Sequence, residues 1–412
     1  MKQSVSRRMW MTSFVGILFF GMAHAEQASV VASFDIGSGS TKMVVSKVDC
    51  SNASTITVGN IHQRVCDISV LDEGSAKHSW KNAVRKDSKG YYFDEAELAK
   101  GLAVLKKLLD QAKKQNPVRF EAAATSAWRT VSEHPNEKGK SAIAAMKDIL
   151  GEGSSFQIIS AEKEAWLGAI SAIKVANVLP KNVLVQDIGG GSQQITVFDS
   201  EGNMKLWLGK DYVASEKFTQ WVSAQKESRI FEKYPELASG SAMASKKGLH
   251  PKTVKKLGWI ESGNPNPIGR LEIIEAQAGA EIFVSHAMGK NEKGQSVTLQ
   301  EAFSDLNLSQ YNVVGIGGVL YYSVLPQVQK QMKWNSDVMS FDKIEIEQTL
   351  QGLLGYTGLQ WDEDKHIWKV EDYSQNVLPN VVLVNAMMDE LRLDAYTSIE
   401  KVNMAHAQAY LN

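Results

Sequence analysis

Apolar residues recur along the chain with two different spacings, and these predict an alternation of helices and strands. Apolar positions three and four residues apart indicate helices over 94–115 and 139–150. Short apolar segments at 118–124 and 155–159 alternate with these helices and predict strands. Such an alternation is typical of an α/β fold with a mixed sheet.

Near the start of this pattern, 41–50 and 55–66 alternate apolar and polar residues and predict a hairpin with a turn at 51–54. Cys50 then lies beside the turn, opposite the first residue of the second strand. Cys66 lies 11 residues farther along, about 36 Å away at ~3.3 Å per residue. Because a disulfide needs Cα atoms within about 7 Å, we expect no disulfide here unless a bulge or a displaced turn changes the register.

The N-terminus has a different pattern. Three basic residues within the first eight precede the apolar segment 9–22, and Ala23 and Ala25 then offer small side chains at the positions that define cleavage. This order predicts a signal peptide, cleaved after Ala25, and a periplasmic or secreted protein without a stable membrane anchor. A buried helix and an uncleaved anchor are the alternatives, and the pattern leaves Sec and twin-arginine export both open.

Charge and composition narrow the classes of function. The 412 residues include 45 Lys+Arg and 46 Asp+Glu, a net charge of −1. Without residues 1–25 the counts are 42 and 46, a net charge of −4. This balance excludes binding of duplex nucleic acid through bulk positive charge. Hydrophobic residues, 43% of the chain, suffice for a packed core, and the length suggests two domains. Two cysteines exclude a four-cysteine zinc site.

An internal repeat is the most informative feature. Residues 34–41 read Phe-Asp-Ile-Gly-Ser-Gly-Ser-Thr, and residues 186–193 read Gln-Asp-Ile-Gly-Gly-Gly-Ser-Gln, 152 positions later. Each core follows an apolar run and precedes an alternating segment. Both therefore predict a strand, a tight turn and a second strand, led by an aspartate.

This chemistry suits a phosphate chain. Glycines allow backbone N–H groups to approach an anion, and hydroxyl groups add donors. The aspartates Asp35 and Asp187 would repel phosphate but suit Mg²⁺, which bridges carboxylate and phosphate; capping of the turns is the alternative. The predicted phosphate-binding residues are Gly37, Ser38, Gly39, Ser40, Thr41, Gly189, Gly190, Gly191 and Ser192.

The paired loops resemble the phosphate loops of the superfamily of actin, sugar kinases and heat-shock ATPases. Within it, the chain resembles the exopolyphosphatase/guanosine pentaphosphate phosphohydrolase family over roughly residues 30–320. Five segments occur in that family's order: FDIGSGSTK (34–42), ATSAWR (124–129), ISAEKEAWL (159–167), VQDIGGGSQQ (185–194) and VGIGGV (314–319).

The resemblance implies roles for single residues. Glu164 matches the family's catalytic glutamate, which positions and deprotonates the attacking water; Glu162 is the fallback, and a solvated glutamate on a helix beginning near Ala161 is the alternative. Arg129 would neutralise charge on phosphate, or else form an ordinary surface ion pair. Gly317 and Gly318 would lie beside a nucleotide's base and sugar, or else make a strand-to-helix turn.

The sequence also departs from the family. Gln194 stands where the family has a glutamate, and a glutamine there resembles the exported apyrases, in which it helps hold the attacking water. Trp166 replaces a common arginine and Gly39 an asparagine. The late Gly-Leu-Arg-Glu-Gly segment of the family and the Asp-Trp-x-x-Gly segment of apyrases are both missing.

The resemblance predicts two actin-like (ribonuclease H-like) domains with mixed sheets flanking a central cleft. They would span 26–159 and 160–392, with a C-terminal helix at 400–412 packing back onto the first. We expect an exported Mg²⁺-dependent phosphoanhydride hydrolase of polyphosphate or guanosine penta- or tetraphosphate. The sequence leaves the oligomeric state open, with a homodimer among the alternatives. The alternatives are an apyrase-like nucleoside tri- or diphosphate hydrolase and a non-catalytic phosphate or nucleotide sensor.

Overall fold

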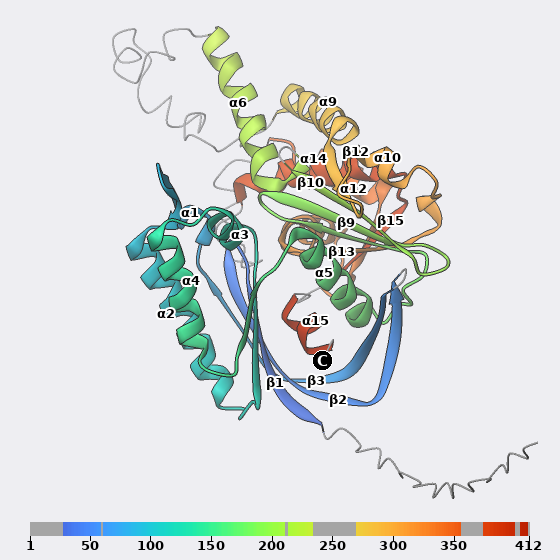
Figure 1. The fold of residues 1–412 in the computed structure, drawn as a ribbon. Coiled ribbons are helices and arrows are strands. Elements are labelled where there is room, and N and C mark those ends of the chain that lie inside the picture. Colours follow the sequence, from blue (N-terminus) through green and yellow to red (C-terminus); the bar gives the residue numbers. More distant parts are fainter. Residues whose placement is uncertain are drawn as a thin grey trace, which may run out of the picture.

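The computed structural model describes residues 28–58, 61–210, 213–233, 269–355, 374–399 and 404–410. The predicted signal peptide lies outside these residues. Two large sheets dominate the part that is described (Figure 1), one of five strands and one of eight. Both mix parallel and antiparallel neighbours, which confirms the predicted α/β class with mixed sheets.

The first sheet has the order β3-β2-β1-β6-β7. Its strands are β1 (Ser29–Ile36), β2 (Ser40–Val58), β3 (Ile61–Lys77), β6 (Arg119–Ala124) and β7 (Ser155–Ile158). The strands β4 (Val84–Asp87) and β5 (Gly90–Phe93) form a separate ribbon. β1 is antiparallel to β2 but parallel to β6, so the carboxyl ends of β1 and β6 meet at one edge.

Helices cover the outer face of the first sheet (Figure 1). They are α1 (Trp80–Ala83), α2 (Glu95–Lys113), α3 (Ser126–Glu133) and α4 (Glu137–Leu150). The two helices predicted from periodicity are confirmed as α2 and α4. α2 begins after Asp94, whose carboxylate accepts hydrogen bonds from the N–H groups of Ala96 and Glu97. The apolar faces of α2 and α4 pack with Phe34 and Ile36 of β1 in one core.

The second sheet has the order β12-β11-β10-β9-β8-β13-β15-β14. Its strands are β8 (Val183–Ile188), β9 (Ser192–Phe198), β10 (Met204–Lys210), β11 (Met288–Asn291), β12 (Ser296–Thr298), β13 (Asn312–Ile316), β14 (Ser340–Asp342) and β15 (Ala395–Ser398). β8 is antiparallel to β9 and parallel to β13, the arrangement that β1 has with β2 and β6.

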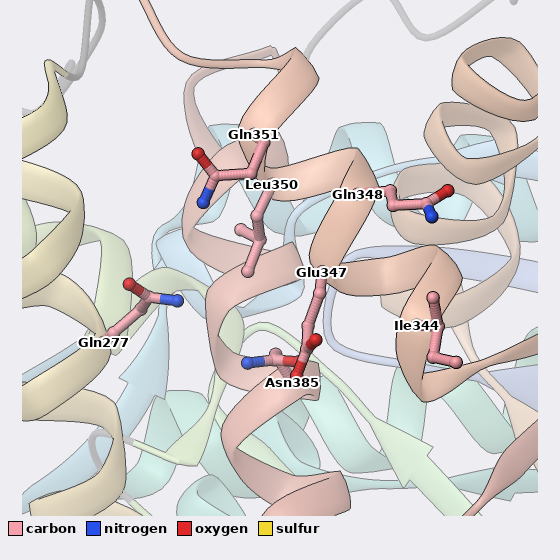
Figure 2. Close-up of a pocket in the computed structure, with 7 residues that line it drawn as sticks. All are labelled: Gln277, Ile344, Glu347, Gln348, Leu350, Gln351 and Asn385. Atoms are coloured by element: carbon pink, nitrogen blue, oxygen red, sulfur yellow. The ribbon is translucent and has the colours of Figure 1, made fainter.

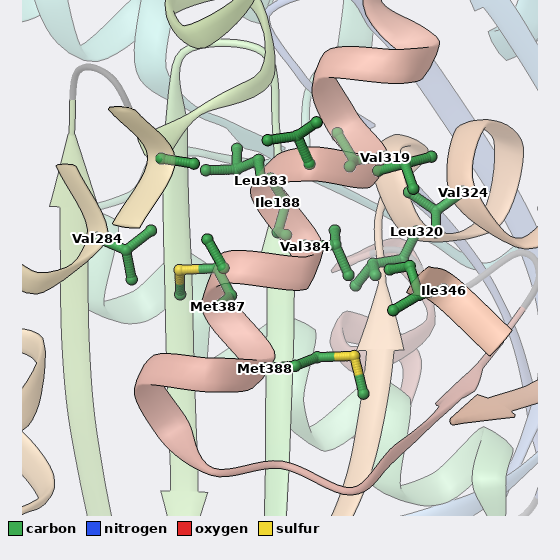
Figure 3. Packing of buried hydrophobic residues seen from close by; sticks show 14 of the residues in the cluster. Ile188, Val284, Val319, Leu320, Val324, Ile346, Leu383, Val384, Met387 and Met388 are labelled. Atoms are coloured by element: carbon green, nitrogen blue, oxygen red, sulfur yellow. The ribbon is translucent and has the colours of Figure 1, made fainter. Parts of the chain in front are cut away.

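The outer helices of the second sheet bury its largest core. They are α6 (Ser215–Lys233), α9 (Arg270–His286), α10 (Leu299–Phe303), α11 (Leu325–Met332), α12 (Lys343–Gly352) and α14 (Ser374–Leu391), with the short turns η3 (Leu308–Gln310) and η4 (Leu320–Val324). Figure 3 shows Leu383 and Met387 of α14 packed among side chains of this core, which include Ile188, Val284 and Leu320.

Two helices lie between the sheets, α5 (Ala161–Ala176) and α15 (Met404–Tyr410) (Figure 1). α5 begins after Ser160, whose hydroxyl accepts a hydrogen bond from Lys163 N at 3.2 Å. One core joins both helices to both sheets, with Ala123 from the first and Val185 from the second. α15 thus packs against the first sheet although it is last in the chain. The predicted domain boundaries stay a prediction.

The expectation that Cys50 and Cys66 are not joined is wrong. The two residues form a disulfide, with Cα atoms 4.5 Å apart. β2 does not turn at 51–54 but continues to Val58, which pairs with Ile61. A register shift between Asp49 and Ser54 then brings Cys50 opposite Cys66. The polar segment 51–54, predicted as a turn, lies inside β2. The Gly59-Asn60 pair is the stronger sequence signal for a two-residue hairpin turn.

Among the described residues, no helix is both long enough and apolar enough to cross a bilayer.

Candidate functional site

The two repeated segments fold into two loops of the same geometry. Each connects two antiparallel strands, β1 to β2 and β8 to β9. In the first, Gly37 N donates to Ser40 O at 2.9 Å, and in the second, Gly189 N donates to Ser192 O, also at 2.9 Å. In each loop the third residue after the Asp-Ile pair, Gly39 or Gly191, is exposed, whereas the two before it are half-buried. The sequence repeat is therefore a repeat of backbone structure.

The aspartates occupy matching places before these loops. Asp35 faces Lys42 across the antiparallel pair β1–β2, and Asp187 faces Gln194 across β8–β9. Lys42 Nζ lies 3.9 Å from Asp35 Oδ2. Lys42 was missed as a site residue. The repeat offset of 152 residues contains the signal, because it relates Lys42 to the predicted site residue Gln194.

An ion pair between two further elements completes the charged part of the site. Arg129 on α3 follows β6, and Glu164 lies in the first turn of α5. Arg129 Nη1 lies 2.8 Å from Glu164 Oε2 and also donates to the backbone oxygen of Ile159 at 2.8 Å. Both side chains are about one-fifth exposed. Neither the surface ion pair nor the solvated glutamate considered above describes this arrangement.

The Glu164 carboxyl group has a raised pKa. Burial raises its pKa from an ordinary value of 4.5 to about 7. Arg129 opposes this increase, while the charges of Asp187 and Asp35 add to it. A carboxyl group with a pKa near neutrality can accept a proton from water in one step and release it in the next. Glu162, the fallback, has a lowered pKa through hydrogen bonds with its own backbone and Ser160.

Asp187 shares this crowded environment. Burial raises its pKa from 3.8 to about 6; Lys42 opposes the increase and Asp35 adds to it. The mutual influence of Asp35, Asp187 and Glu164 shows that the two loops and α5 bring three carboxyl groups into one electrostatic environment. Each comes from a different element, and a cation among them would relieve their repulsion.

The chemistry of these residues fits Mg²⁺. This ion is usually held by one or two carboxylates, water and substrate phosphates, not by an all-protein cage. In the described ranges, no group of three or more histidine, cysteine, aspartate or glutamate side chains is arranged to hold a metal. Asp35 and Asp187 are the residues that would hold it, and its charge would offset the burial and the Asp35 repulsion that raise the pKa of Asp187.

The glycine segment that follows β13 contacts Asp187. Gly317 follows β13 with a φ of +88°, and a Cβ at this position would overlap the Asp187 carboxylate oxygen. The residue therefore permits a close approach that other side chains would block. Around the Cβ position of Gly318 there is open space within 4 Å. The structure places Gly317 beside Asp187; the predicted contact of Gly317 and Gly318 with a nucleotide stays a prediction.

The polar loop residues differ in what they offer a ligand. The Ser38 hydroxyl is buried without a hydrogen-bond partner among the described residues. Thr41 is fully buried, and its hydroxyl accepts a hydrogen bond from Trp80 Nε1 at 3.4 Å. Its buried position presents no surface to a phosphate, so it supports the loop from inside. Ser40 and Ser192 are partly exposed at the loop ends.

Two pockets lie away from these loops. One of about 330 Å³ lies among α9, α12 and α14 and has carboxamides in its lining, including Gln277, Gln351 and Asn385 (Figure 2). Another of about 590 Å³ lies beside β13 and β15 and includes Tyr311. Neither contains a loop glycine or a residue of the Arg129–Glu164 pair.

A comparison with protein families finds one match. Residues 68–207 match the model of the Ppx/GppA phosphatase family, a segment that contains Arg129, Glu164 and the second loop. This confirms the predicted resemblance for that part of the chain. No curated protein sequence matches the chain.

Solved structures extend the likeness in fold to almost the whole chain. The PPX-GPPA enzyme of Aquifex aeolicus covers 93% of this chain and 99% of its own, with 13% identity and a TM-score of 0.56. An exopolyphosphatase from Cytophaga hutchinsonii covers 92% and 96%, with 13% identity and a TM-score of 0.55. Nucleoside triphosphate hydrolases from Neospora caninum cover 91% and 88%, with 10% identity and a TM-score of 0.50. These likenesses confirm the predicted actin-like fold.

Proposed function

We propose that this protein is an exported, Mg²⁺-dependent phosphoanhydride hydrolase that releases phosphate from inorganic polyphosphate or guanosine penta- or tetraphosphate. One observation carries the proposal. The Arg129–Glu164 pair, with a Glu164 pKa of about 7, lies in the same electrostatic environment as the aspartates of the two glycine loops. The match of residues 68–207 to a phosphatase family supports the same chemistry.

In the proposed reaction, a water molecule attacks the terminal phosphorus. Ionised Glu164 orients this water and takes its proton, a new O–P bond forms, and the bridging P–O bond breaks. The bridging oxygen leaves as the end of the shortened chain, and inorganic phosphate is released. Arg129 binds phosphate oxygens and offsets the charge that develops on them.

The remaining residues bind and orient the substrate. Backbone N–H groups of Gly39 and Gly191, at the exposed loop tips, offer donors to phosphate oxygens. Bound Mg²⁺ would supply positive charge that the acidic chain otherwise lacks. Asp35 and Asp187 would hold it, and Gln194, opposite Asp187, would help to place the water.

Export is supported by two independent features. The N-terminal sequence has the order of a signal peptide. Cys50 and Cys66 form a disulfide, a bond that persists in oxidising compartments such as the bacterial periplasm. Together they support a periplasmic or secreted protein.

A specific observation favours a second candidate function. Gln194 is almost fully buried and faces Asp187 across β8–β9, where the sequence resembles the apyrases. An apyrase-like hydrolase of nucleoside tri- or diphosphates would use the same carboxylates and loops.

A phosphate-release assay on the purified protein without residues 1–25 tests the proposal and separates the candidates. The substrates are polyphosphate, guanosine pentaphosphate, ATP and ADP, each with Mg²⁺ and with EDTA. Turnover of the first two supports the proposal, and preference for ATP and ADP supports the apyrase-like function. Binding without phosphate release from any of them would contradict both and identify a sensor.

A further inference from the structure

A second ion pair joins the two glycine loops, and it contains residues that the mechanism above does not use. Lys81 on α1 and Glu216 on α6 are far apart in sequence, yet Lys81 Nζ lies 2.5 Å from Glu216 Oε2. Lys81 belongs to the first sheet's helices and Glu216 to the second's (Figure 1). The pair therefore bridges the two halves of the molecule.

Each partner is fixed at its backbone to one of the loops. Lys81 N donates to Ser38 O at 3.2 Å, and Glu216 N donates to Gly190 O at 2.9 Å. Ser38 and Gly190 occupy the same position in the repeat, 152 residues apart. The two side chains thus begin at matching points of the two loops and meet between them.

The lysine ammonium group lies within reach of the second loop. Its Nζ is 3.5 Å from the position that a Cβ on Gly191 would occupy, and Gly191 is the exposed tip of that loop. A phosphate bound by backbone N–H groups there would lie next to this cation. Glu216 Oε1 lies closest to the Cβ position of Gly190, at 2.7 Å, so its carboxylate occupies space beside the same loop.

The pair can exchange partners. The Lys81 and Glu216 side chains are 44% and 43% exposed, and ion pairs of such exposure contribute little to stability. A flexible lysine can turn to a phosphate chain, which carries several negative charges, while water solvates the released carboxylate. The ion pair is thus positioned to compete with a polyanion.

We propose that Lys81 is a phosphate-binding, specificity-determining residue, and that Glu216 occupies it until a phosphate chain displaces the carboxylate. This inference rests on the proposed function and assigns Lys81 to a phosphate that the two loops hold between them. It favours substrates with several linked phosphates over single phosphate esters, because such chains reach Lys81 beyond the phosphate under attack.

Two substitutions break the same ion pair but have opposite expected effects. Lys81→Met removes the cation and is expected to raise KM for polyphosphate about tenfold, the scale of one charge-assisted hydrogen bond. Glu216→Gln frees the cation and is expected to lower KM about threefold. In both variants kcat should change by less than about twofold. A pair that only clamps the two halves together would shift KM in the same direction in both variants.

A double-mutant cycle separates exchange from general electrostatics. If Glu216 acts through Lys81, Glu216→Gln has no effect on KM in the Lys81→Met background. If it acts only as a nearby negative charge, its effect persists there, and the proposal is overturned. Lys138→Met is the matched control. Lys138 Nζ lies 2.7 Å from Glu95 Oε1, and this ion pair joins two helices away from the loops. The KM of this variant should equal that of the wild type.

Polyphosphate binding to Glu164→Gln protein, measured by calorimetry with and without each substitution, distinguishes the two proposals. The expected shifts in Kd without wild-type turnover would retain the role of Lys81 and reject the hydrolase. Turnover with unchanged KM and Kd in Lys81→Met would reject the role of Lys81 alone. Absence of both turnover and binding would reject both.

Discussion

Arg129 Nη1 lies 2.8 Å from Glu164 Oε2, although the two residues belong to different helices, α3 and α5. The same nitrogen holds the carbonyl of Ile159, two residues before α5 begins. The guanidinium group therefore fixes both the start of α5 and the carboxyl group in its first turn. It opposes the increase that burial causes in the Glu164 pKa without removing it.

Glu164→Gln tests the role of the proposed base. We expect phosphate release to fall about 10²- to 10⁴-fold, the usual contribution of general base catalysis, with polyphosphate binding largely intact. Turnover by release of phosphate and binding by calorimetry give the two values. Glu162→Gln is the control two residues away. An unchanged kcat in Glu164→Gln, or an equal loss in both variants, would reject Glu164 as the base.

The pH profile should follow the ionisation of Glu164. Only the ionised form accepts a proton from water, so kcat/KM is expected to rise with pH through about 7 and to level off above it. Arg129→Gln removes the group that lowers this pKa and should move the rise to higher pH. A rise caused by the ionisation of the substrate would stay at the same pH in this variant.

The same shift affects stability. A pKa that is higher in the folded protein favours the protonated native state. The resulting contribution is fully present below the ordinary value of 4.5 and is lost as pH rises through about 7. The free energy of unfolding should therefore fall over this interval in the metal-free protein, and less so in Glu164→Gln. Urea unfolding at several pH values measures it.

Removal of Mg²⁺ should abolish turnover reversibly. Asp35 and Asp187 repel each other without a cation, and Asp187→Asn is expected to raise the Mg²⁺ concentration for half-maximal activity about tenfold or more, since it removes one carboxylate ligand. Activity titrations after EDTA treatment give this value. Full activity in EDTA would contradict a metal-dependent site.

Gly317→Ala should reduce activity strongly, because the new Cβ overlaps the Asp187 carboxylate and the backbone has a φ of +88°. Gly294→Ala is a control for the backbone alone, with a φ of +73° and open space within 4 Å of its Cβ position. The left-handed backbone should cost each variant about 1 kcal/mol of stability, and the overlap with Asp187 should cost Gly317→Ala more, but only Gly317→Ala should lose turnover. Equal activity in both would mean that Asp187 does not depend on this contact.

Reduction of the Cys50–Cys66 disulfide should lower the free energy of unfolding by about 2–3 kcal/mol, the amount expected for a loop of this size. The bond joins residues 16 apart and ties β2 to β3 beside its register shift. Urea unfolding of the oxidised and reduced wild type measures the difference without changing the packing of a side chain. Cys50→Ala/Cys66→Ala should match the reduced protein, and identical curves for both redox states would contradict a stabilising role.

Much of the local structure follows from the sequence. The periodicity of apolar residues predicts α2, α4, β6 and β7. Each of these elements is stabilised by packing one face against a core, so its apolar residues recur with the period of that element. The two loops come from the repeat, since glycine and aspartate are required by short-range backbone geometry. Asp35 and Asp187 follow from the repeat and its phosphate chemistry, whereas Arg129 and Glu164 follow from the resemblance to a family; the proximity of all four residues is a consequence of the fold.

Other features depend on residues far apart in the chain, and only the tertiary structure determined them. The Cys50–Cys66 bond requires a register shift that no periodicity encodes. The pKa of Glu164 depends on its burial and on the charges of Arg129, Asp187 and Asp35, and the contact of Lys81 with Glu216 depends on how the two halves pack. Sequence patterns report which face of an element is apolar, because that preference is local. Which charged side chains meet between the two halves depends on the packing of whole sheets, so it was decided only by the assembled fold.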